Sequence, residues 1–407
     1  PGAEARRSEG EVLTLEPAPR PGRRPSGRIG LALAGGGPLG AYYEIGALQA
    51  LAESVDGLDL TRLHTYVGVS SGSVIASCLA NGIDTEDLAR LFITSESARY
   101  PVSPAMLFRP AFNEYLERIS QLPGMLVEGL RQYARRPFSS ELTGALVPVS
   151  HALPSGVFDN APLERMLGQL LGTEGRSNDF RRLARRLYVV ATDLDSGEAT
   201  VFGRRGLQDV PISRAVQAST ALPGLYKPVA IGGHRYVDGA LRRTMHASLA
   251  LEAGDDFVIC MNPLVAYSTR ENLARRGLPT VLSQTFRALI QSRMQVGMAD
   301  YPDRYPTSDI LLFQPDDTDE RMFFLNVFKY GDRQRLTEHA YQRTREDLRR
   351  AGPRLARILA RHGLGLRREL LRDRERSFIG AVRAHRRSGR SVLAELEATL
   401  ERLRSAI

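Results

Sequence analysis

The sequence predicts an α/β protein with a mostly parallel sheet, and two neighbouring stretches carry most of that prediction. An apolar strand pattern at 29–34 runs into a glycine cluster and then into a helix of small and apolar residues at about 41–54. A second apolar strand at 66–69 runs into another glycine-containing turn and a helical pattern at 73–81. Short apolar runs of this kind are typical of strands buried in a parallel sheet. Since the carboxyl ends of such strands share one edge of the sheet, both turns are expected there.

The first turn is rich in glycine, with Gly35, Gly36, Gly37 and Gly40 inside six residues. Glycine lets backbone N–H groups approach a ligand, because no Cβ stands in the way. The N-terminus of the following helix adds N–H donors without intrahelical partners and the positive end of a dipole. We therefore expect an anion-binding cradle at this turn.

The second turn, Gly68-Val69-Ser70-Ser71-Gly72, fits the G-x-S-x-G pattern of a nucleophile elbow. In such an elbow the central serine sits on a sharp strand-to-helix turn and presents its Oγ at the end of the sheet. Chance matches to this pattern are common, but here a strand precedes the serine and a helix follows it. Ser71 and Ser73 are rival nucleophiles that lack the central position. An N–H cradle beside an exposed serine is the arrangement that acyl transfer needs.

The glycine run at 35–40 also satisfies G-x-G-x-x-G, the dinucleotide-binding pattern. That reading requires an acidic residue at the end of the next strand, about 20 residues on, to bind a ribose. Here the next strand ends in Gly68-Val69-Ser70 instead. A dinucleotide-binding oxidoreductase is therefore the less favoured alternative.

A third motif, Asp238-Gly239-Ala240, completes a pattern that resembles the patatin-like phospholipases. That family joins a G-G-G-x-[RK]-G loop, a G-x-S-x-G serine and a later D-G-[GA] acid in this order, and the resemblance covers about 30–315. It implies a three-layer α/β/α fold with a central, mostly parallel sheet, to which this chain adds a helical insertion and a helical C-terminal extension. The sequence departs from the family at Leu39, where Arg or Lys is usual, so a cation beside the glycine loop is missing.

The resemblance also implies an activity, that of a serine lipid acyl hydrolase of the phospholipase A or lysophospholipase type. Ser70 would attack a membrane lipid or lipid ester and Asp238 would accept its proton, as a dyad without histidine. An acyl-enzyme would form, and no metal or cofactor would be needed. The expected oxyanion donors are Gly35, Gly36, Gly37, Gly40 and Ser71, and the remaining motif residues are Gly68, Gly72 and Gly239.

Other residues offer alternative assignments. His246 follows Asp238 in the chain order of a Ser-Asp-His triad, but it lies in a helix-start pattern. Asp193 and Asp195 are rival acids whose surroundings are more typical of a cap or turn. A non-catalytic, membrane-associated lipid-binding protein on the same fold is a second alternative, which Leu39 keeps open.

The rest of the chain continues the alternation of strands and helices. Further strands are expected at 187–192, 199–203, 229–231, 234–237, 257–260 and 310–313. Further helices are expected at 85–95, 158–171, 211–218, 247–253, 279–298 and, with a break near 352–353, 332–362. The helix at 279–298 is expected to bury Val281, Leu282, Phe286, Leu289 and Ile290.

Composition divides the chain into three segments. Residues 1–28 are rich in Pro, Gly and Arg and are expected to be disordered. Residues 29–330 would form the hydrolase domain, with a helical, cap-like insertion at about 96–150. Its amphipathic helices (about 110–121 and 123–135) would pack on the core as an ordinary insertion, the slightly favoured alternative, or act as a lid or membrane-facing cap. Residues 331–407 would form an Arg-rich helical extension, and the apolar cluster within 316–330 would line an acyl groove or belong to the core.

The overall composition is that of a globular protein, with 407 residues, 43% hydrophobic and 25% charged. A net charge of +9 predicts attraction to an anionic membrane surface, although arginine richness from genome composition is an equal alternative. No nucleic-acid motif is present, so no nucleic acid is expected as a partner. Cys78 and Cys260 lie in apolar runs typical of core thiols. Without a signal peptide or a membrane-spanning run, a cytoplasmic or peripheral membrane location is expected.

Overall fold

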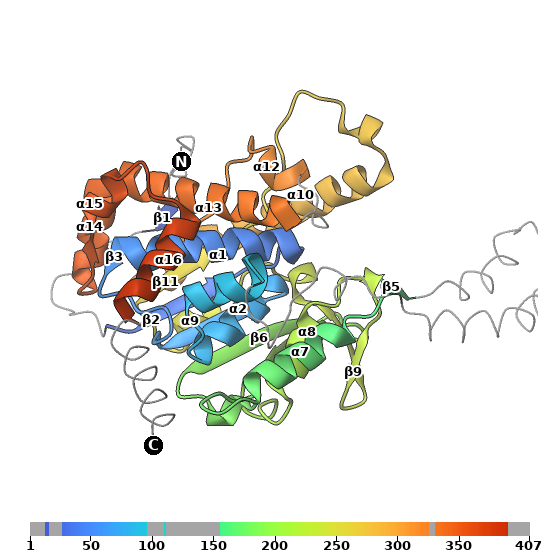
Figure 1. Cartoon of the computed structure of the whole chain (residues 1–407). Helices are drawn as coiled ribbons and strands as arrows, with labels where there is room; N and C mark the ends of the chain where they lie inside the picture. The colour runs from blue at the N-terminus through green and yellow to red at the C-terminus, as the bar shows by residue number, and fades with distance from the viewer. Residues whose placement is uncertain (1–12, 16–26, 96–109, 111–154, 325–329, 390–407) are drawn as a thin grey trace, which may run out of the picture.

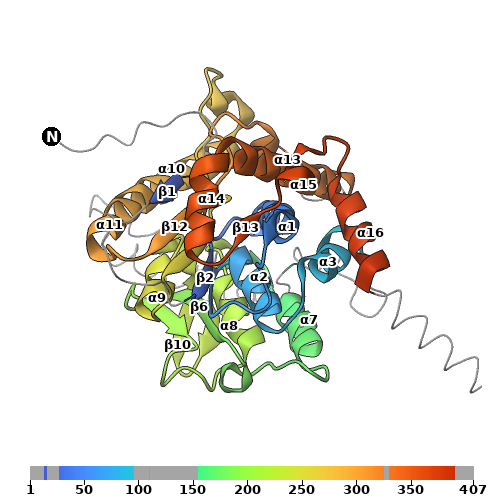
Figure 2. The ribbon, with the colours of Figure 1, turned by 90° about the vertical axis from the view of Figure 1, so that its left-hand side faces the viewer.

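The computed structural model describes residues 13–15, 27–95, 110, 155–324 and 330–389. Within them a nine-stranded sheet has helices on both faces (Figure 1, Figure 2). Its strands follow the order β1 (Leu13–Leu15), β12 (Asp309–Phe313), β11 (Phe257–Met261), β2 (Ile29–Leu33), β4 (Thr65–Val69), β6 (Arg186–Asp193), β10 (His234–Asp238) and β9 (Val229–Ile231), and β7 (Ala199–Phe202) pairs with β6. In this order the five neighbouring strands β12, β11, β2, β4 and β6 are parallel to one another. The pairs that add β1, β10, β9 and β7 to the sheet are antiparallel. The predicted α/β fold with a central, mostly parallel sheet is confirmed.

Successive residues of the central strands face opposite sides of the sheet, so each face has its own core. In β2, Leu31 and Leu33 belong to one apolar cluster and Ala32 to the other. Phe257 and Val258 of β11 divide between the clusters in the same way. Because both faces are covered, these strands read as continuous apolar runs rather than as alternating ones.

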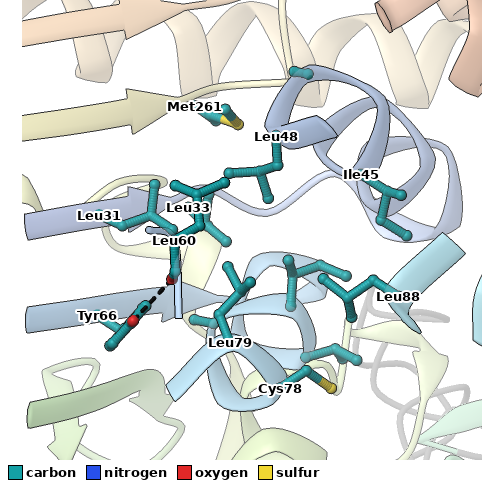
Figure 3. Packing of buried hydrophobic residues seen from close by; sticks show 14 of the residues in the cluster. Leu31, Leu33, Ile45, Leu48, Leu60, Tyr66, Cys78, Leu79, Leu88 and Met261 are labelled. Atoms are coloured by element: carbon teal, nitrogen blue, oxygen red, sulfur yellow. Dashed lines mark hydrogen bonds between the residues drawn. The ribbon is translucent and has the colours of Figure 1, made fainter. Parts of the chain in front are cut away.

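The larger cluster lies between the sheet and a set of helices that includes the two following the glycine turns. These helices are α1 (Gly37–Ser54), α2 (Ser71–Ala80), α3 (Thr85–Leu88), α7 (Ala161–Leu171), α8 (Ile212–Ser219) and α12 (Arg321–Phe324). Figure 3 shows Leu31 and Leu33 of the sheet packed near Leu48 of α1 and Leu79 of α2. The buried Tyr66 hydroxyl donates a hydrogen bond of 2.8 Å to the Leu60 carbonyl, so this polar group has its partner inside the core.

The opposite face is covered by α9 (Ala247–Glu252), α10 (Leu278–Ala299) and α11 (Tyr301–Arg304). Helix α10 buries Ile290 against the sheet, as the sequence predicted. The predicted burial of Val281, Leu282 and Leu289 was wrong, since they are 38%, 58% and 52% exposed. These three residues lie on the side of α10 that faces away from the sheet.

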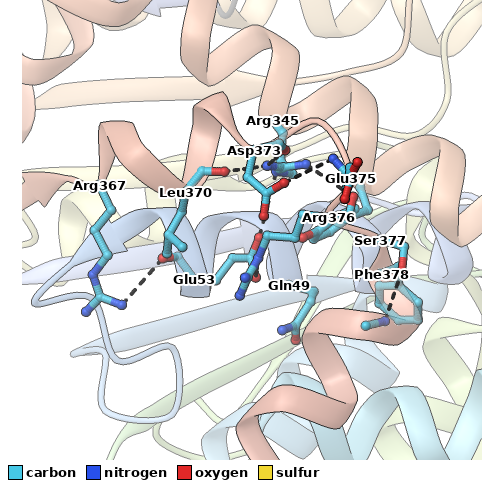
Figure 4. Close-up of polar contacts among 12 residues, drawn as sticks. Gln49, Glu53, Arg345, Arg367, Leu370, Asp373, Glu375, Arg376, Ser377 and Phe378 are labelled. Atoms are coloured by element: carbon cyan, nitrogen blue, oxygen red, sulfur yellow. Dashed lines mark hydrogen bonds and ion pairs between the residues drawn. The ribbon is translucent and has the colours of Figure 1, made fainter.

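Most of the C-terminal helices pack against α1. The C-terminal helices are α13 (Tyr330–Arg350), α14 (Gly352–Arg361), α15 (Arg368–Arg372) and α16 (Phe378–Gly389), and Figure 2 shows α13, α15 and α16 beside α1. Charged groups tie them to α1, because Glu53 pairs with Arg376 at 2.8 Å and with Arg345 at 3.8 Å (Figure 4). Two further sheets have two strands each. One pairs β3 (Val55–Asp56) with β13 (Gly365–Leu366), and the other pairs β5 (Gly156–Phe158) with β8 (Gly224–Tyr226).

Several local expectations need correction. Helix α1 begins at Gly37 rather than near 41, because Pro38 fits the first helical turn, where its missing N–H is not needed. Leu13–Leu15, in the segment expected to be disordered, forms β1. The expected helix at 158–171 begins at Ala161, and the one at 85–95 is α3 followed by a π-helix at Ala89–Ile93. The helices expected at 110–121 and 123–135 lie outside the described residues, apart from Pro110.

Within the described ranges, no helix has both the length and the apolar character to cross a bilayer.

Candidate active site

Ser70 occupies a sharp turn between β4 and α2. Its backbone has φ 51° and ψ −126°, and Ser95 is the other non-glycine residue with positive φ in the described chain. A non-glycine residue rarely adopts this conformation. The turn is held by the Ser70 N–H, which donates to Ser219 Oγ at 2.8 Å, and by the Ser70 carbonyl, which accepts from the Ser73 N–H at 2.9 Å.

The two glycines of the elbow allow close backbone contact. A Cβ on Gly72 would lie 2.6 Å from the carbonyl oxygen of Leu33, and one on Gly68 would lie 2.4 Å from Ser73 Cα. Any side chain at either position would therefore push α2 away from the sheet. The spacing of the G-x-S-x-G pattern follows from this tight crossing of helix and strands.

Asp238 is brought to Ser70 by the register of the sheet. Strand β6 lies between β4 and β10, and its residue Val190 pairs with Val69 while Ala191 pairs with Asp238. Ser70 Oγ donates a hydrogen bond of 2.6 Å to Asp238 Oδ2. The other carboxylate oxygen accepts the Ala240 N–H at 2.9 Å, so both oxygens of Asp238 are engaged.

The pair is buried, and burial changes its acid–base properties. The exposed fraction is 7% for Ser70 and 2% for Asp238. Burial raises the pKa of Asp238 from 3.8 to about 6, although the hydrogen bonds from Ser70 and Ala240 act in the opposite direction. A carboxylate with a pKa near 6 is ionised at neutral pH and is more basic than an ordinary aspartate.

The glycine loop places free N–H donors beside the serine. Gly36, Gly37 and Ser71 line the same pocket as Ser70, and their N–H groups donate to no other described residue. A Cβ on Gly35 would lie 2.8 Å from Ser70 Cβ, so this glycine allows the loop to approach. The Gly40 N–H donates to the Gly36 carbonyl at 3.0 Å inside α1. Of the five expected oxyanion donors, the structure therefore brings Gly36, Gly37 and Ser71 to the pocket with their N–H groups free.

The third motif is also sterically constrained. A Cβ on Gly239 would lie 2.2 Å from the Val190 carbonyl oxygen, so the chain after Asp238 can pass β6 only without a side chain.

The rival histidine and acids lie elsewhere. His246 precedes α9, makes no hydrogen bond with Ser70 or Asp238, and its Nε2 has no partner within the described chain. Burial lowers the pKa of His246 to about 3. Asp193 accepts the N–H groups of Asp195 and Ser196, each at 3.0 Å, as the turn assignment predicts. His246, Asp193 and Asp195 do not line the pocket, whereas Ser71, the rival serine next to Ser70, does.

The pocket has a volume of about 300 Å³ and mostly apolar walls. Besides the residues of the two turns and Asp238, its lining includes Pro38, Ala41, Tyr42, Val74, Ile75, Phe92, Asn160, Leu163, Thr220, Leu222, Leu225, Tyr226, Ala240, Leu264, Ser283, Phe286 and Arg287. The sequence did not identify Arg287 or Phe286 as pocket residues. No local motif marks them, because only the packing of α10 brings them to the site.

In the described ranges, no cluster of three or more His, Cys, Asp and Glu side chains is suited to hold a metal ion. Cys78 and Cys260 are both buried free thiols, as expected from their apolar surroundings.

Part of the chain matches a known family and several curated proteins. The family model described as patatin-like phospholipase matches residues 31–251, more than half of the 407 residues. An uncharacterized NTE family protein of Mycobacterium tuberculosis is 27% identical over 241 residues, which are 59% of this chain and 31% of that protein. An uncharacterized protein of Acanthamoeba polyphaga mimivirus is 23% identical over 209 residues, 51% of this chain and 57% of that protein. The matches therefore span less than two thirds of these relatives.

Solved structures with similar chain arrangements include VipD from Legionella pneumophila. Its TM-score is 0.39 at 16% identity, covering 85% of this chain and 71% of that chain. Human GIVD cytosolic phospholipase A2, in complex with methyl gamma-linolenyl fluorophosphonate, has a TM-score of 0.33 at 13% identity, covering 82% and 59%.

Proposed function

The chain belongs to the patatin-like phospholipase family, and from this premise we propose that it hydrolyses fatty-acyl esters of lipids. Ser70 is the nucleophile and Asp238 its general base. The observation that carries the proposal is the 2.6 Å hydrogen bond from Ser70 Oγ to Asp238 Oδ2, at the wall of an apolar pocket. A serine hydroxyl becomes an effective nucleophile when an adjacent base removes its proton.

The first half of the reaction forms an acyl-enzyme. Asp238 accepts the hydroxyl proton as Ser70 Oγ attacks the ester carbonyl carbon. The oxyanion that develops is held by the free N–H groups of Gly36, Gly37 and Ser71, and loss of one such donor typically costs about 100- to 1000-fold in rate. When the tetrahedral intermediate collapses, the leaving alcohol takes the proton from Asp238.

The second half releases the fatty acid. Asp238 accepts a proton from a water molecule, whose oxygen attacks the acyl carbonyl. Collapse of the second intermediate returns the proton to Ser70 and frees the acid. The apolar wall, with Leu163, Leu222 and Leu225, suits the acyl chain, since each buried CH₂ contributes about 0.8 kcal/mol.

The test is fatty-acid release from labelled phospholipid vesicles in buffer containing a calcium chelator. Ser70→Ala should lower release by at least about a thousandfold, because nucleophile and base act as a unit. Asp238→Asn should lose nearly as much, whereas His246→Ala should remain active. A severe loss in His246→Ala with a mild loss in Asp238→Asn would instead favour a triad.

Labelling supplies a readout that does not depend on the natural substrate. An alkyl fluorophosphonate should modify Ser70 in the native chain and in Ser73→Ala, and peptide mass spectrometry would locate the adduct. Absence of both label and release, with vesicle binding retained, would support the non-catalytic lipid-binding alternative.

A further inference from the structure

Arg287 is a buried cation in the wall of the candidate active site. It lies on α10, is 8% exposed, and lines the pocket that also contains Ser70 and Asp238. Among the described residues that line this pocket, Asp238 and Arg287 are the two that carry a charge.

The guanidinium group has few partners. Arg287 Nη1 donates to the Val265 carbonyl at 3.4 Å, and its Cζ lies 4.3 Å from the centre of the Phe323 ring. Within the described chain, no carboxylate pairs with Arg287. The Val265 contact and the Phe323 ring orient the group but do not neutralise it.

Another buried arginine, Arg345, has the partners that Arg287 lacks. It pairs with Glu53 and donates to the backbone carbonyls of Leu370 and Asp373, the latter at 2.7 Å (Figure 4). A buried charge is costly unless a counter-charge and hydrogen bonds compensate for desolvation. Burial lowers the pKa of Arg287 to about 10, so the group stays charged at neutral pH, and among the described residues no carboxylate pairs with it.

We propose that Arg287 binds the phosphate of the lipid substrate and makes the site selective for phosphate-bearing lipid esters over neutral ones. This inference rests on the proposed hydrolase function of the same pocket. In a glycerophospholipid the scissile ester and the phosphate are attached to one glycerol, so an ester held beside Ser70 brings the phosphate close to the wall of the same pocket, which includes Arg287. The planar guanidinium donates paired hydrogen bonds that match phosphate oxygens.

The glycine loop itself offers no competing cation. Position 39 is leucine, and its side chain packs against the larger apolar cluster. Arg287, which is 248 residues further along the chain, therefore provides the positive charge that faces the pocket.

The first test compares two substrates with the same acyl chain, a lysophosphatidylcholine and a monoacylglycerol. Arg287→Gln should lower kcat/KM for the lysophospholipid by about 10- to 100-fold, as expected for a lost charge-assisted hydrogen bond, and leave the monoacylglycerol little changed. Arg287→Lys should recover part of the loss. Arg293→Gln is the matched control, because Arg293 is exposed on the same helix and does not line the pocket. Equal losses on both substrates would overturn the proposal.

The second test measures binding without turnover. Isothermal titration of dodecyl phosphate, dodecanoate and dodecanol into Ser70→Ala protein should give tightest binding for the phosphate, and adding Arg287→Gln should weaken that binding selectively. Tighter binding of dodecanoate, or no effect of Arg287→Gln, would overturn the phosphate assignment. If the native chain hydrolyses no ester, the proposed function fails, whereas these titrations still decide the role of Arg287.

Discussion

At the residue scale, the Ser70–Asp238 pair couples its chemistry to pH through burial. In the proposed mechanism Asp238 acts as a base only when ionised, and burial raises its pKa to about 6. The cause is desolvation of the carboxylate, which the hydrogen bonds from Ser70 and Ala240 offset only in part. The strained φ of Ser70 belongs to the same site and keeps Oγ beside this carboxylate.

This pair predicts the direction of the pH dependence. With a soluble short-chain ester, kcat/KM should be low below pH about 5, rise as pH passes through about 6, and then level off, because kcat/KM reports ionisation of the free enzyme. The measurement is a pH–rate profile between about pH 4 and 9 with enzyme stability checked at each point. A profile already level at pH 4.5 would show that Asp238 titrates like an exposed carboxyl. A fall in rate across pH 6 would show that the protonated form is the active one.

At the element scale, α10 has two contrasting sides. Its inner side contributes Arg287 to the pocket and buries Ile290 and Met294. Its outer side exposes Leu282, Leu289 and Val296, which are seven residues apart and 58%, 52% and 67% exposed. Figure 1 shows α10 at the periphery of the molecule, and the segment before it carries exposed Arg270, Arg275 and Arg276. We propose that this apolar side, with the basic segment, contacts an anionic lipid surface.

The α10 proposal predicts a separation of vesicle binding from catalysis. Replacing Leu282, Leu289 and Val296 together by serine should weaken binding to anionic vesicles by at least about tenfold, because apolar surface no longer leaves water on docking. Co-sedimentation with vesicles measures the binding, and turnover of a soluble short-chain ester should be unchanged. A triple replacement of the neighbouring polar Thr285, Ser292 and Gln295 by alanine is the control. Unchanged vesicle binding in the serine variant would reject this role for α10.

At the scale of the whole molecule, the C-terminal helices are packed into the same body as the site. Leu336 and Tyr341 of α13 are buried in the larger cluster, and Glu53 links α1 to Arg345 and Arg376. The first turn of α1 belongs to the glycine loop, and α13 packs against α1 and so stabilises its position. We propose that residues 29–324 and 330–383 fold as one unit, although composition alone had divided the chain near residue 330.

Substituting alanine for glycine should have opposite effects on stability at two helix positions. One position lies in the contact between α1 and α13, and the other is an open position on α10. A Cβ on Gly46 would lie 2.3 Å from the Thr337 carbonyl oxygen, so Gly46→Ala should lower the free energy of unfolding by about 1–3 kcal/mol through overpacking. A Cβ on Gly297 of α10 would meet nothing within 4 Å, so Gly297→Ala should raise stability by up to about 1 kcal/mol through helix propensity. Urea unfolding measures both. Equal stability of Gly46→Ala and the native chain would show that α13 separates easily from α1.

The sequence predicted those features whose causes are local. The strand, glycine turn and helix at 29–54 and again at 66–80 are visible because burial on both faces requires apolar strands and close approach requires glycine. Where local signals were weaker, the predicted helix boundaries differ from the observed ones, as at the start of α1. The prediction also assigned exposed residues of α10 to the core. An apolar stripe on a helix does not say which neighbour covers it.

By itself the sequence determined the fold class, the order of the three motifs and the two residues of the proposed dyad. The tertiary structure decided their geometry: Ser70 meets Asp238, 168 residues away, because β6 pairs with both β4 and β10 in one register. It also decided that α10 turns Arg287 into the pocket and that Gly40 uses its N–H inside α1. The physical reason is that strand register and helix rotation are set by contacts between distant segments, whereas glycine turns and apolar runs are set within a few residues.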